Sequence, residues 1–337
     1  MKKLGIGILL FAALLGIFLL VKNGAVPKEK VKEKPLLKYT YQNLKKINFG
    51  SSPITLGRIL DDKQNYVSQM FYYSVRDVVA GRSREMKISG LINIPKKTGT
   101  YPIIVLMRGF VPIEIYSTGV GTKRDGEFFV QNGFITLAPD FLGYGESDKP
   151  SQNSIEERFQ TYTTALTLLS SLPNLNSGLD ASYSGKIKAD SLKTGIWAHS
   201  NGGQIAISVL EISGKNYPTV LWAPVSKPFP YSVLYYTDEY DDHGKALRKV
   251  IADFENDYNI ESYSPTNFYS WINAPIEIHQ GTADESVPLK WSDNLVADLK
   301  KFGKNVTYFT YPGADHNLMP GWDVAIWRSL DYFKNHL

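Results

Sequence analysis

The pentapeptide Ala198-His199-Ser200-Asn201-Gly202 constrains this chain more than any other segment. Residues 194–198 have the apolar pattern of a short buried strand, and residues 203–210 have the pattern of a helix. A serine between such elements stands on a sharp turn with its hydroxyl exposed. The turn is so tight that only small residues fit on either side of it, here Ala198 and Gly202, although glycine is usual at the first position. The pentapeptide therefore predicts a nucleophilic serine at position 200.

Two later loops supply partners for this serine. A serine hydroxyl is a weak nucleophile until a base takes its proton, and the base needs an acid to orient it. On a chain with this turn, the acid and then the histidine are expected after the serine. Strand-like runs at 275–279 and 306–311 lead into loops that hold Asp284 and His316. Catalytic groups of open parallel sheets gather in such loops, so the sequence predicts a triad of Ser200, Asp284 and His316.

Elimination among the five histidines also favours His316 as the base. His199 adjoins the serine and is expected to point away from it, and His279 lies within a strand-like run. His243 is in an acidic polar segment, and His336 is next to the C-terminus.

Two other carboxylates compete with Asp284 for the role of the acid. Asp315 is adjacent to His316 in the sequence, which makes a side-chain hydrogen bond between them awkward. Glu285 is expected to face solvent. Asp284 is therefore the predicted acid.

Acyl transfer also needs an oxyanion hole, in which backbone N–H groups face the charge that develops on the substrate carbonyl oxygen. One donor is expected to be the N–H of Asn201, which follows the nucleophile. The apolar run 101–107 is typical of a strand buried on both faces, and it ends in Arg108-Gly109-Phe110. We therefore expect the second donor to be the N–H of Phe110.

With these motifs the chain resembles the α/β-hydrolase superfamily and, within it, the catalytic domain of the prolyl oligopeptidase family of serine peptidases. The resemblance covers residues 66–337 and rests on the segments 88–95 and 133–148 and on the loops of the serine, aspartate and histidine. It implies an α/β-hydrolase fold, with a mostly parallel sheet and helices on both faces. Dienelactone-hydrolase-like and acyl esterases share most of these segments. Larger family members carry a β-propeller, for which this chain has no room.

Arg108 departs from the His-Gly pair that many relatives have before the oxyanion donor. Three roles stay open for it. The guanidinium could pair with a carboxylate near the site, bind a substrate carboxylate, or form a purely structural ion pair.

Composition excludes several other classes of function. The 337 residues hold no cysteine, which excludes disulfides, a thiol nucleophile and cysteine-ligated zinc. The net charge is +4 without a basic patch on the folded part, so nothing indicates nucleic-acid binding. The length fits one substantial catalytic domain with small additions.

The N-terminus predicts a contact with a membrane. Lys2 and Lys3 precede an uncharged apolar run at 4–21, which is long enough to cross a bilayer as a helix. Residues 1–25 are therefore expected to form a membrane anchor or a signal peptide, followed by a tether and extension at 26–65. The segment 23–25 is a poor cleavage site, which favours an anchor with the catalytic domain outside the cytoplasm; secretion after cleavage is the alternative.

The catalytic domain is expected at 66–337. Strands at 67–75 and 87–94 are predicted to be antiparallel and to lead a parallel sheet. An insertion at about 227–271 breaks the alternation of strands and helices and is expected to form a helical cap over the site. Its aromatic residues include Tyr235 and Tyr236, which are candidates for substrate binding, while its many acidic residues are expected mainly to face water.

These observations predict a serine hydrolase that acts by acyl transfer on a small molecule or short peptide, with no metal or organic cofactor. The resemblance favours a serine peptidase. A carboxylesterase or acyl esterase is the alternative, because the propeller is missing and the cap is aromatic. A membrane-tethered binding protein without activity is a third class, against which the complete set of Ser200, Asp284 and His316 argues. The sequence predicts no oligomeric state.

Overall fold

The computed structural model describes residues 33–79 and 82–337, and the candidate site belongs to the compact unit Leu36–Leu337. The membrane segment predicted at 4–21 lies outside the described residues and stays a prediction. None of the helices in the described ranges is both long enough and apolar enough to cross a membrane.

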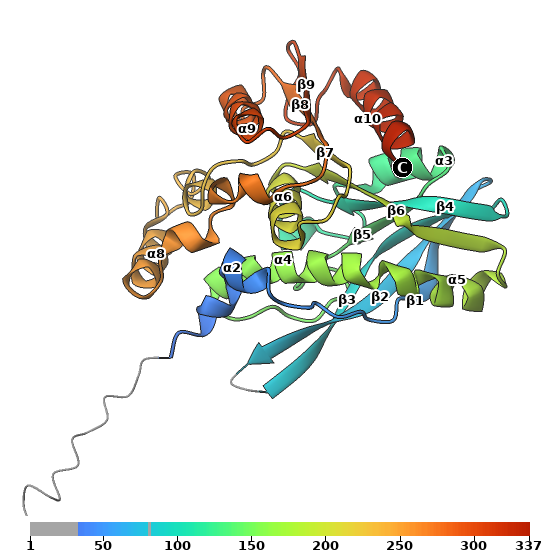
Figure 1. Cartoon of the computed structure of the whole chain (residues 1–337), viewed down its shortest axis with the longest axis horizontal. Coiled ribbons are helices and arrows are strands. Elements are labelled where there is room, and N and C mark those ends of the chain that lie inside the picture. Colours follow the sequence, from blue (N-terminus) through green and yellow to red (C-terminus); the bar gives the residue numbers. More distant parts are fainter. Residues whose placement is uncertain (1–32, 80–81) are drawn as a thin grey trace, which may run out of the picture. The chain divides into compact units, whose positions relative to one another are not determined.

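A nine-stranded sheet runs through the compact unit (Figure 1). Its spatial order is β1-β2-β3-β5-β4-β6-β7-β8-β9. The first three strands pair antiparallel and β3 joins β5 antiparallel, whereas the six strands from β5 to β9 in this order are parallel. The strands are β1 (Thr55–Asp62), β2 (Tyr66–Val79), β3 (Arg82–Pro95), β4 (Gly99–Met107), β5 (Ile135–Pro139), β6 (Ile187–His199), β7 (Thr219–Trp222), β8 (Ile276–Gly281) and β9 (Val306–Tyr311).

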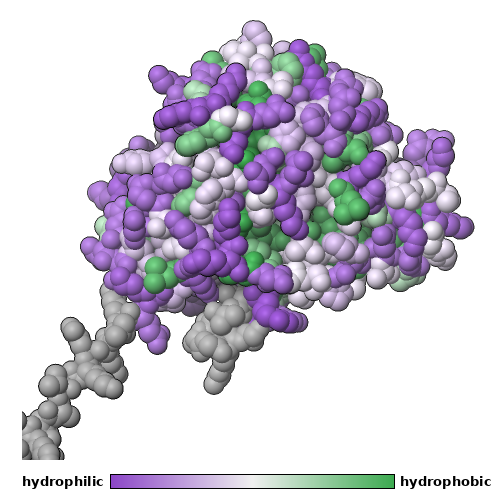
Figure 2. All heavy atoms as spheres, viewed as in Figure 1, coloured by the Kyte–Doolittle hydropathy of each residue, from purple (hydrophilic) through white to green (hydrophobic). Residues whose placement is uncertain are grey.

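Helices cover both faces of this sheet, which confirms the predicted α/β-hydrolase architecture (Figure 1). One face packs against α3 (Lys123–Gln131) and α10 (Trp322–His336). The opposite face packs against α4 (Ser154–Ser171), α5 (Leu175–Tyr183), α6 (Asn201–Ser213) and α9 (Leu289–Lys301). The apolar residues of β4 are buried on both sides, as the uninterrupted run at 101–107 predicted. The outer face drawn in Figure 2 is mainly hydrophilic, with small separate apolar spots.

Residues 36–65, predicted as a tether and extension up to residue 65, belong to the compact unit Leu36–Leu337. The 3₁₀ helix η1 (Pro35–Tyr39) and the short helix α2 (Tyr41–Leu44) bring Tyr41 into the core, where its hydroxyl donates to Ser208 Oγ at 2.6 Å. Strand β1 pairs with β2 at the edge of the sheet. Most of β1 is solvent-exposed, so it lacks the apolar alternation by which a strand is recognised.

The segment predicted as a cap consists of helices and helical turns. It contains α7 (Tyr231–Leu234) and α8 (Lys245–Asp257), followed by the 3₁₀ turns η4 (Ile260–Tyr263), η5 (Pro265–Asn267) and η6 (Tyr269–Trp271). Further 3₁₀ turns are η2 (Ile113–Ile115) and η3 (Leu172–Asn174). Helix α8 buries Ile251 and Phe254 and exposes most of its charged residues, as expected of a solvated helix face.

A buried carboxyl in α6 makes stability depend on pH. Both carboxyl oxygens of Glu211 are buried without a hydrogen-bond partner among the described residues, and this burial raises the pKa of Glu211 well above its usual value. The folded state therefore holds a proton that the unfolded chain releases above the ordinary glutamate pKa. This contribution to the free energy of unfolding is fully present below the ordinary glutamate pKa. It is lost as pH rises from there toward the raised pKa of the folded state, by at most about 1.4 kcal/mol per pH unit.

We expect Glu211→Gln to remove this pH dependence, because glutamine has no proton to release. The stability of the variant relative to the native protein should grow as pH rises from about 5 to 8. Urea unfolding at several pH values measures this difference. Glu255→Gln, on the exposed face of α8, is the matched control and should leave the slope unchanged. Parallel pH curves for the native protein and Glu211→Gln would contradict the prediction.

Candidate active site

Ser200 stands on a strained turn between β6 and α6. Its backbone has φ 57° and ψ −122°, a left-handed conformation that costs a non-glycine residue about 1–3 kcal/mol. Gly202 lets the turn pack tightly, because a Cβ at this position would lie 2.0 Å from the Met107 carbonyl oxygen. Ala198 is fully buried at the end of β6. The turn thus has the geometry that the small residues on either side of Ser200 predicted.

The segment that follows β4 lies directly against this turn. A Cβ added to Gly109 would be 3.0 Å from Ser200 Cβ and 3.5 Å from its Oγ. The N–H of Phe110 has no acceptor among the described residues. Asn201 begins α6, so its N–H has no intrahelical acceptor either. Both predicted oxyanion donors therefore come from backbone segments packed around Ser200, and both are free to bind an oxygen atom.

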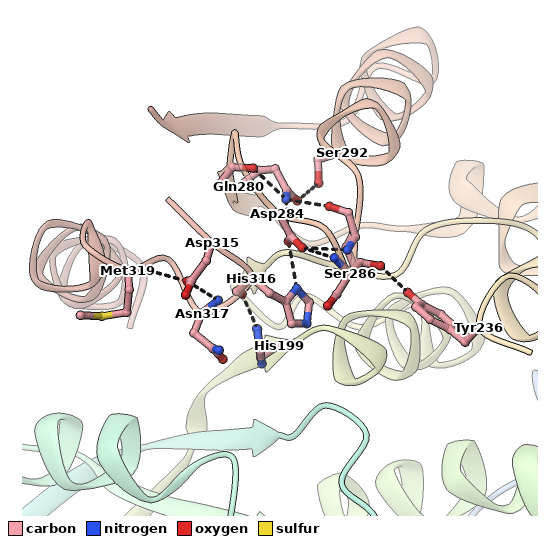
Figure 3. Close-up of polar contacts among 12 residues, drawn as sticks. His199, Tyr236, Gln280, Asp284, Ser286, Ser292, Asp315, His316, Asn317 and Met319 are labelled. Carbon is pink, nitrogen blue, oxygen red and sulfur yellow. Dashed lines mark hydrogen bonds and ion pairs between the residues drawn. The ribbon is translucent and has the colours of Figure 1, made fainter. Parts of the chain in front are cut away.

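Asp284 and His316 meet above the same edge of the sheet (Figure 3). Asp284 follows β8 and His316 follows β9, and His316 Nδ1 lies 2.9 Å from Asp284 Oδ2. Because a carboxylate accepts, His316 Nδ1 donates in this bond, and Nε2 is left as the nitrogen that can accept a proton. The structure brings this predicted pair together.

Four donors hold the Asp284 carboxylate in place. Besides His316, the backbone N–H groups of Ser286 and Val287 donate to Oδ1 at 2.9 and 2.8 Å, and Gln280 Nε2 donates to Oδ2 at 2.9 Å. Burial alone would raise the pKa of Asp284, but the hydrogen bonds from His316, Val287 and Gln280 together outweigh it and lower that pKa. The carboxylate is therefore ionised and fixed in orientation. Gln280 was not among the predicted site residues, because the sequence marks it only as a polar residue at the end of a buried strand.

The Ser200 hydroxyl makes no hydrogen bond to His316 or to any other group in the described ranges of the chain. Its backbone is nevertheless fixed, because the N–H of Ser200 donates to the Trp222 carbonyl at 2.9 Å and its carbonyl accepts from Val225 at 3.0 Å. Hydrogen bonds between a nucleophile and its base often tighten only when substrate binds. The geometry therefore leaves the side chain of Ser200 free to rotate.

His199 packs against the loop of His316, where the sequence predicted only that it turns away from the serine. Its ring centroid lies 4.6 Å from that of His316, and its Nε2 lies 2.9 Å from the His316 carbonyl oxygen (Figure 3). Since a carbonyl only accepts, His199 Nε2 donates this bond. Burial first, and then the nearby His316, lower the pKa of His199 to about 4. A neutral His199 thus supports the backbone of His316 without adding charge.

The other candidates for acid and base lie elsewhere. His279 is fully buried, with Nε2 2.8 Å from Glu277 Oε1 and Nδ1 2.7 Å from the Tyr311 hydroxyl. Asp315 accepts from two backbone N–H groups of its own turn, and Glu285 is exposed. Asp284 is therefore the carboxylate that reaches His316.

Arg108 makes no ion pair among the described residues, although one of its predicted roles was a structural ion pair. Its side chain is 7% exposed, and its guanidinium carbon lies 4.1 Å from the ring centroid of Tyr144 and 4.6 Å from that of Tyr116. Its Nη1 donates to the Gly109 carbonyl at 3.0 Å and Nη2 to the Asp140 carbonyl at 3.1 Å. The guanidinium thus holds the loop that follows β4.

A pocket beside Ser200 has Phe110 and Asn201 in its wall, and neither Tyr235 nor Tyr236 lines it. Tyr235 is 46% exposed and packs against Trp291, with ring centroids 4.7 Å apart. The Tyr236 hydroxyl donates to the Ser286 carbonyl at 3.1 Å, so it is tied to the loop of Asp284 (Figure 3). From the cap segment, Val233 is among the residues that line the pocket.

No group of three or more His, Cys, Asp or Glu residues with the geometry of a metal site occurs within 33–79 and 82–337.

Comparisons with known proteins agree with this geometry. The model of the prolyl oligopeptidase family matches residues 125–337, which is more than half of the chain. The chain is 26% identical over 259 residues to the uncharacterized peptidase YtmA of Bacillus subtilis strain 168, a match that covers 75% of this chain and 91% of that protein.

Solved structures with similar folds include two esterases of low sequence identity. Acetyl xylan esterase from Paenibacillus sp. R4 is 14% identical with a TM-score of 0.58, and the match covers 91% of this chain and 96% of that one. Acetyl xylan esterase 1 from Thermoanaerobacterium sp. JW/SL YS485 is 16% identical with a TM-score of 0.54, covering 89% and 94%. At such identities the likeness shows the fold alone. Together with the family match, it establishes that this chain belongs to the prolyl oligopeptidase family and is a serine hydrolase of the α/β-hydrolase superfamily.

Proposed function

We propose that this hydrolase works by acyl transfer, with Ser200 as nucleophile, His316 as base and Asp284 as the acid that orients it. The observation that carries the proposal is the 2.9 Å bond between His316 and Asp284 at the edge of the sheet where the strained turn presents Ser200. Folding alone does not require these three residue types in three separate loops. A catalytic centre does require them.

The proposed reaction has two halves. Ser200 Oγ attacks the substrate carbonyl carbon while His316 Nε2 takes the hydroxyl proton, and Asp284 stabilises the imidazolium that forms. The tetrahedral intermediate collapses when His316 returns that proton to the leaving amine or alcohol. Water then attacks the acyl-enzyme, again losing a proton to His316, and the carboxylic acid product leaves as the proton returns to Ser200.

The N–H groups of Asn201 and Phe110 serve as the oxyanion donors. The C=O of Gly109 and the N–H of Phe110 belong to one planar peptide and point in opposite directions. Arg108 donates to that C=O, so it fixes the direction in which the N–H of Phe110 points. An oxyanion donor that is oriented before the reaction stabilises the developing charge without reorganisation.

A peptide bond is the favoured target, because the family and the Bacillus relative are described as peptidases. A carboxylic ester is the second candidate. It is favoured by the acetyl xylan esterases, which share the fold over about nine-tenths of this chain. The same catalytic groups can cleave either bond, so the substrate decides between the two candidates.

Matched substrates distinguish a peptidase from an esterase. We expect the full-length protein to cleave peptide p-nitroanilides, with Ser200→Ala as the blank. Activated esters alone cannot decide, because peptidases also cleave them. Anilide cleavage that disappears in Ser200→Ala would establish an amidase or peptidase. Turnover of short-chain p-nitrophenyl esters with no cleavage of any anilide would establish a carboxylesterase instead.

A further inference from the structure

A pocket of about 280 Å³ opens beside Ser200. Its wall includes Phe110 and Asn201, the two residues proposed as oxyanion donors. Helix α4 contributes to another side of it, and the cap segment contributes apolar side chains. The volume is close to the lower limit for small-molecule sites, which suits one amino-acid side chain or a short acyl chain.

Two arginines line this pocket. Arg158, on α4, donates through Nη2 to Gln204 Oε1, while its Nε is buried without a partner in the part of the chain that the structure describes. Arg108 also has a buried Nε without a partner, although both its Nη atoms bind backbone carbonyls. Neither guanidinium lies within ion-pair distance of a carboxylate in the described ranges. Two cationic groups therefore line the pocket, and of the two, Arg108 also interacts electrostatically with the buried Asp140 carboxylate.

The one acidic residue in the wall is Glu157, which is exposed. The acidic residues of the cap do not line the pocket. A charge held away from water is costly unless an opposite charge accompanies it. Arginine presents a planar set of donors that matches a carboxylate in a bidentate manner. The wall is thus complementary to an anion, and Arg158, which is partly exposed, would present its guanidinium to a carboxylate.

The position of the pocket relative to the catalytic groups also indicates which part of a substrate it binds. The leaving atom must receive its proton from His316, and neither His316 nor Asp284 lines this pocket. The oxyanion donors do line it. A group bound here therefore stays attached to the carbonyl carbon and belongs to the acyl side of the scissile bond.

We propose that this pocket selects substrates whose acyl group carries a carboxylate, with Arg158 as the residue that binds it and Arg108 adding positive charge from the wall. In a peptide, that acyl group is an acidic residue immediately before the cleaved bond. The inference rests on the proposed acyl-transfer function, and it adds the substrate class.

Matched ester and anilide pairs test this selection. One pair is the mono-p-nitrophenyl ester of glutaric acid and p-nitrophenyl pentanoate, which differ chiefly in the terminal carboxylate. The other is a set of acetyl-capped peptide p-nitroanilides with Glu, Gln or Lys before the anilide. The native protein should prefer the carboxylate substrate in each case. In Arg158→Gln we expect kcat/KM for it to fall about 10- to 100-fold, while the neutral substrate changes less than about twofold.

Three further variants sharpen the test. Arg158→Lys, which keeps the charge, should recover part of the preference. Glu157→Gln should preserve or strengthen it, because this change removes the one carboxylate of the wall. Arg248→Gln is the control, since it removes an exposed arginine that pairs with Asp238 and does not line the pocket.

The outcomes separate this inference from the proposed function. Equal losses for charged and neutral substrates in Arg158→Gln would overturn the inference while Ser200-dependent turnover stands. The inference would also be overturned if the native protein preferred the anilide with Lys and lost this preference in Glu157→Gln. Activity that survives Ser200→Ala would instead overturn the proposed function. If Arg158→Gln does not fold, inhibition of the native protein decides: competitive inhibition by glutarate but not by glutaramide supports the inference, and equal inhibition overturns it.

Discussion

Ser200→Ala should lower kcat by about 10⁴- to 10⁶-fold, the range over which a triad nucleophile accounts for turnover. The substitution removes only Oγ, and the described structure gives that atom no hydrogen bond on which folding could depend. Alanine also tolerates the φ of 57° no worse than serine does. Thermal unfolding should therefore be unchanged while ester and anilide turnover are lost. Retained turnover in Ser200→Ala would rule Ser200 out as the nucleophile.

Asp284→Asn should lower kcat almost as much, by about 10⁴-fold, because an amide that replaces the carboxylate favours the wrong tautomer of the histidine. The substitution has a second effect here. Its new NH₂ group must replace either Oδ2, where it faces both the His316 Nδ1 and the Gln280 Nε2 donors, or Oδ1, where it faces two backbone N–H donors. The double variant Ser200→Ala with Asp284→Asn should be no slower than Ser200→Ala, since the residues act as one unit. Additive losses would show that Asp284 acts independently of the serine.

The sequence predicted the strained turn and the pairing of Asp284 with His316 because both depend on local chemistry. A turn that needs small residues at fixed positions carries its own pattern, as Gly202 shows by its contact with the Met107 carbonyl. The acid and the base each follow a recognisable strand, and the parallel order of β6, β7, β8 and β9 brings their loops to one edge. Local motifs and strand order together were therefore enough to predict that these loops lie at one edge of the sheet.

Features that depend on distant packing could not be predicted in the same way. The role of Arg108 depends on Tyr116 and Tyr144, which lie in other loops and meet its guanidinium only in the folded chain. Arg158 lies in a helix whose pattern indicates only core packing, so nothing in the sequence shows that its guanidinium reaches the pocket. Strand β1 is an exposed edge, where burial leaves little imprint on the sequence. Composition could not reveal these tertiary contacts.

Arg108→Lys should separate the orientation of the oxyanion donor from the charge of the pocket. A lysine keeps the positive charge, but its single ammonium cannot stack on Tyr144 and Tyr116 while it donates to the carbonyls of Gly109 and Asp140. The peptide that carries the N–H of the oxyanion loop then loses its support. Complete loss of one oxyanion donor costs about 10²- to 10³-fold in kcat, so a donor that is present but poorly oriented should cost about 10- to 100-fold.

This loss should appear in kcat rather than in KM, because the oxyanion forms only after attack on the carbonyl. Affinity for a trifluoromethyl ketone, whose adduct with the serine places an oxyanion in the hole, should fall in step with kcat. Arg328→Lys, which alters another arginine stacked on an aromatic ring, 4.2 Å from the centroid of Phe309, is the control and should leave kcat unchanged. The loss should also be equal for charged and neutral acyl groups, unlike that of Arg158→Gln. A loss confined to carboxylate substrates would show instead that the guanidinium of Arg108 contacts the substrate carboxylate directly, because the charge is kept and a misoriented oxyanion donor slows every substrate alike.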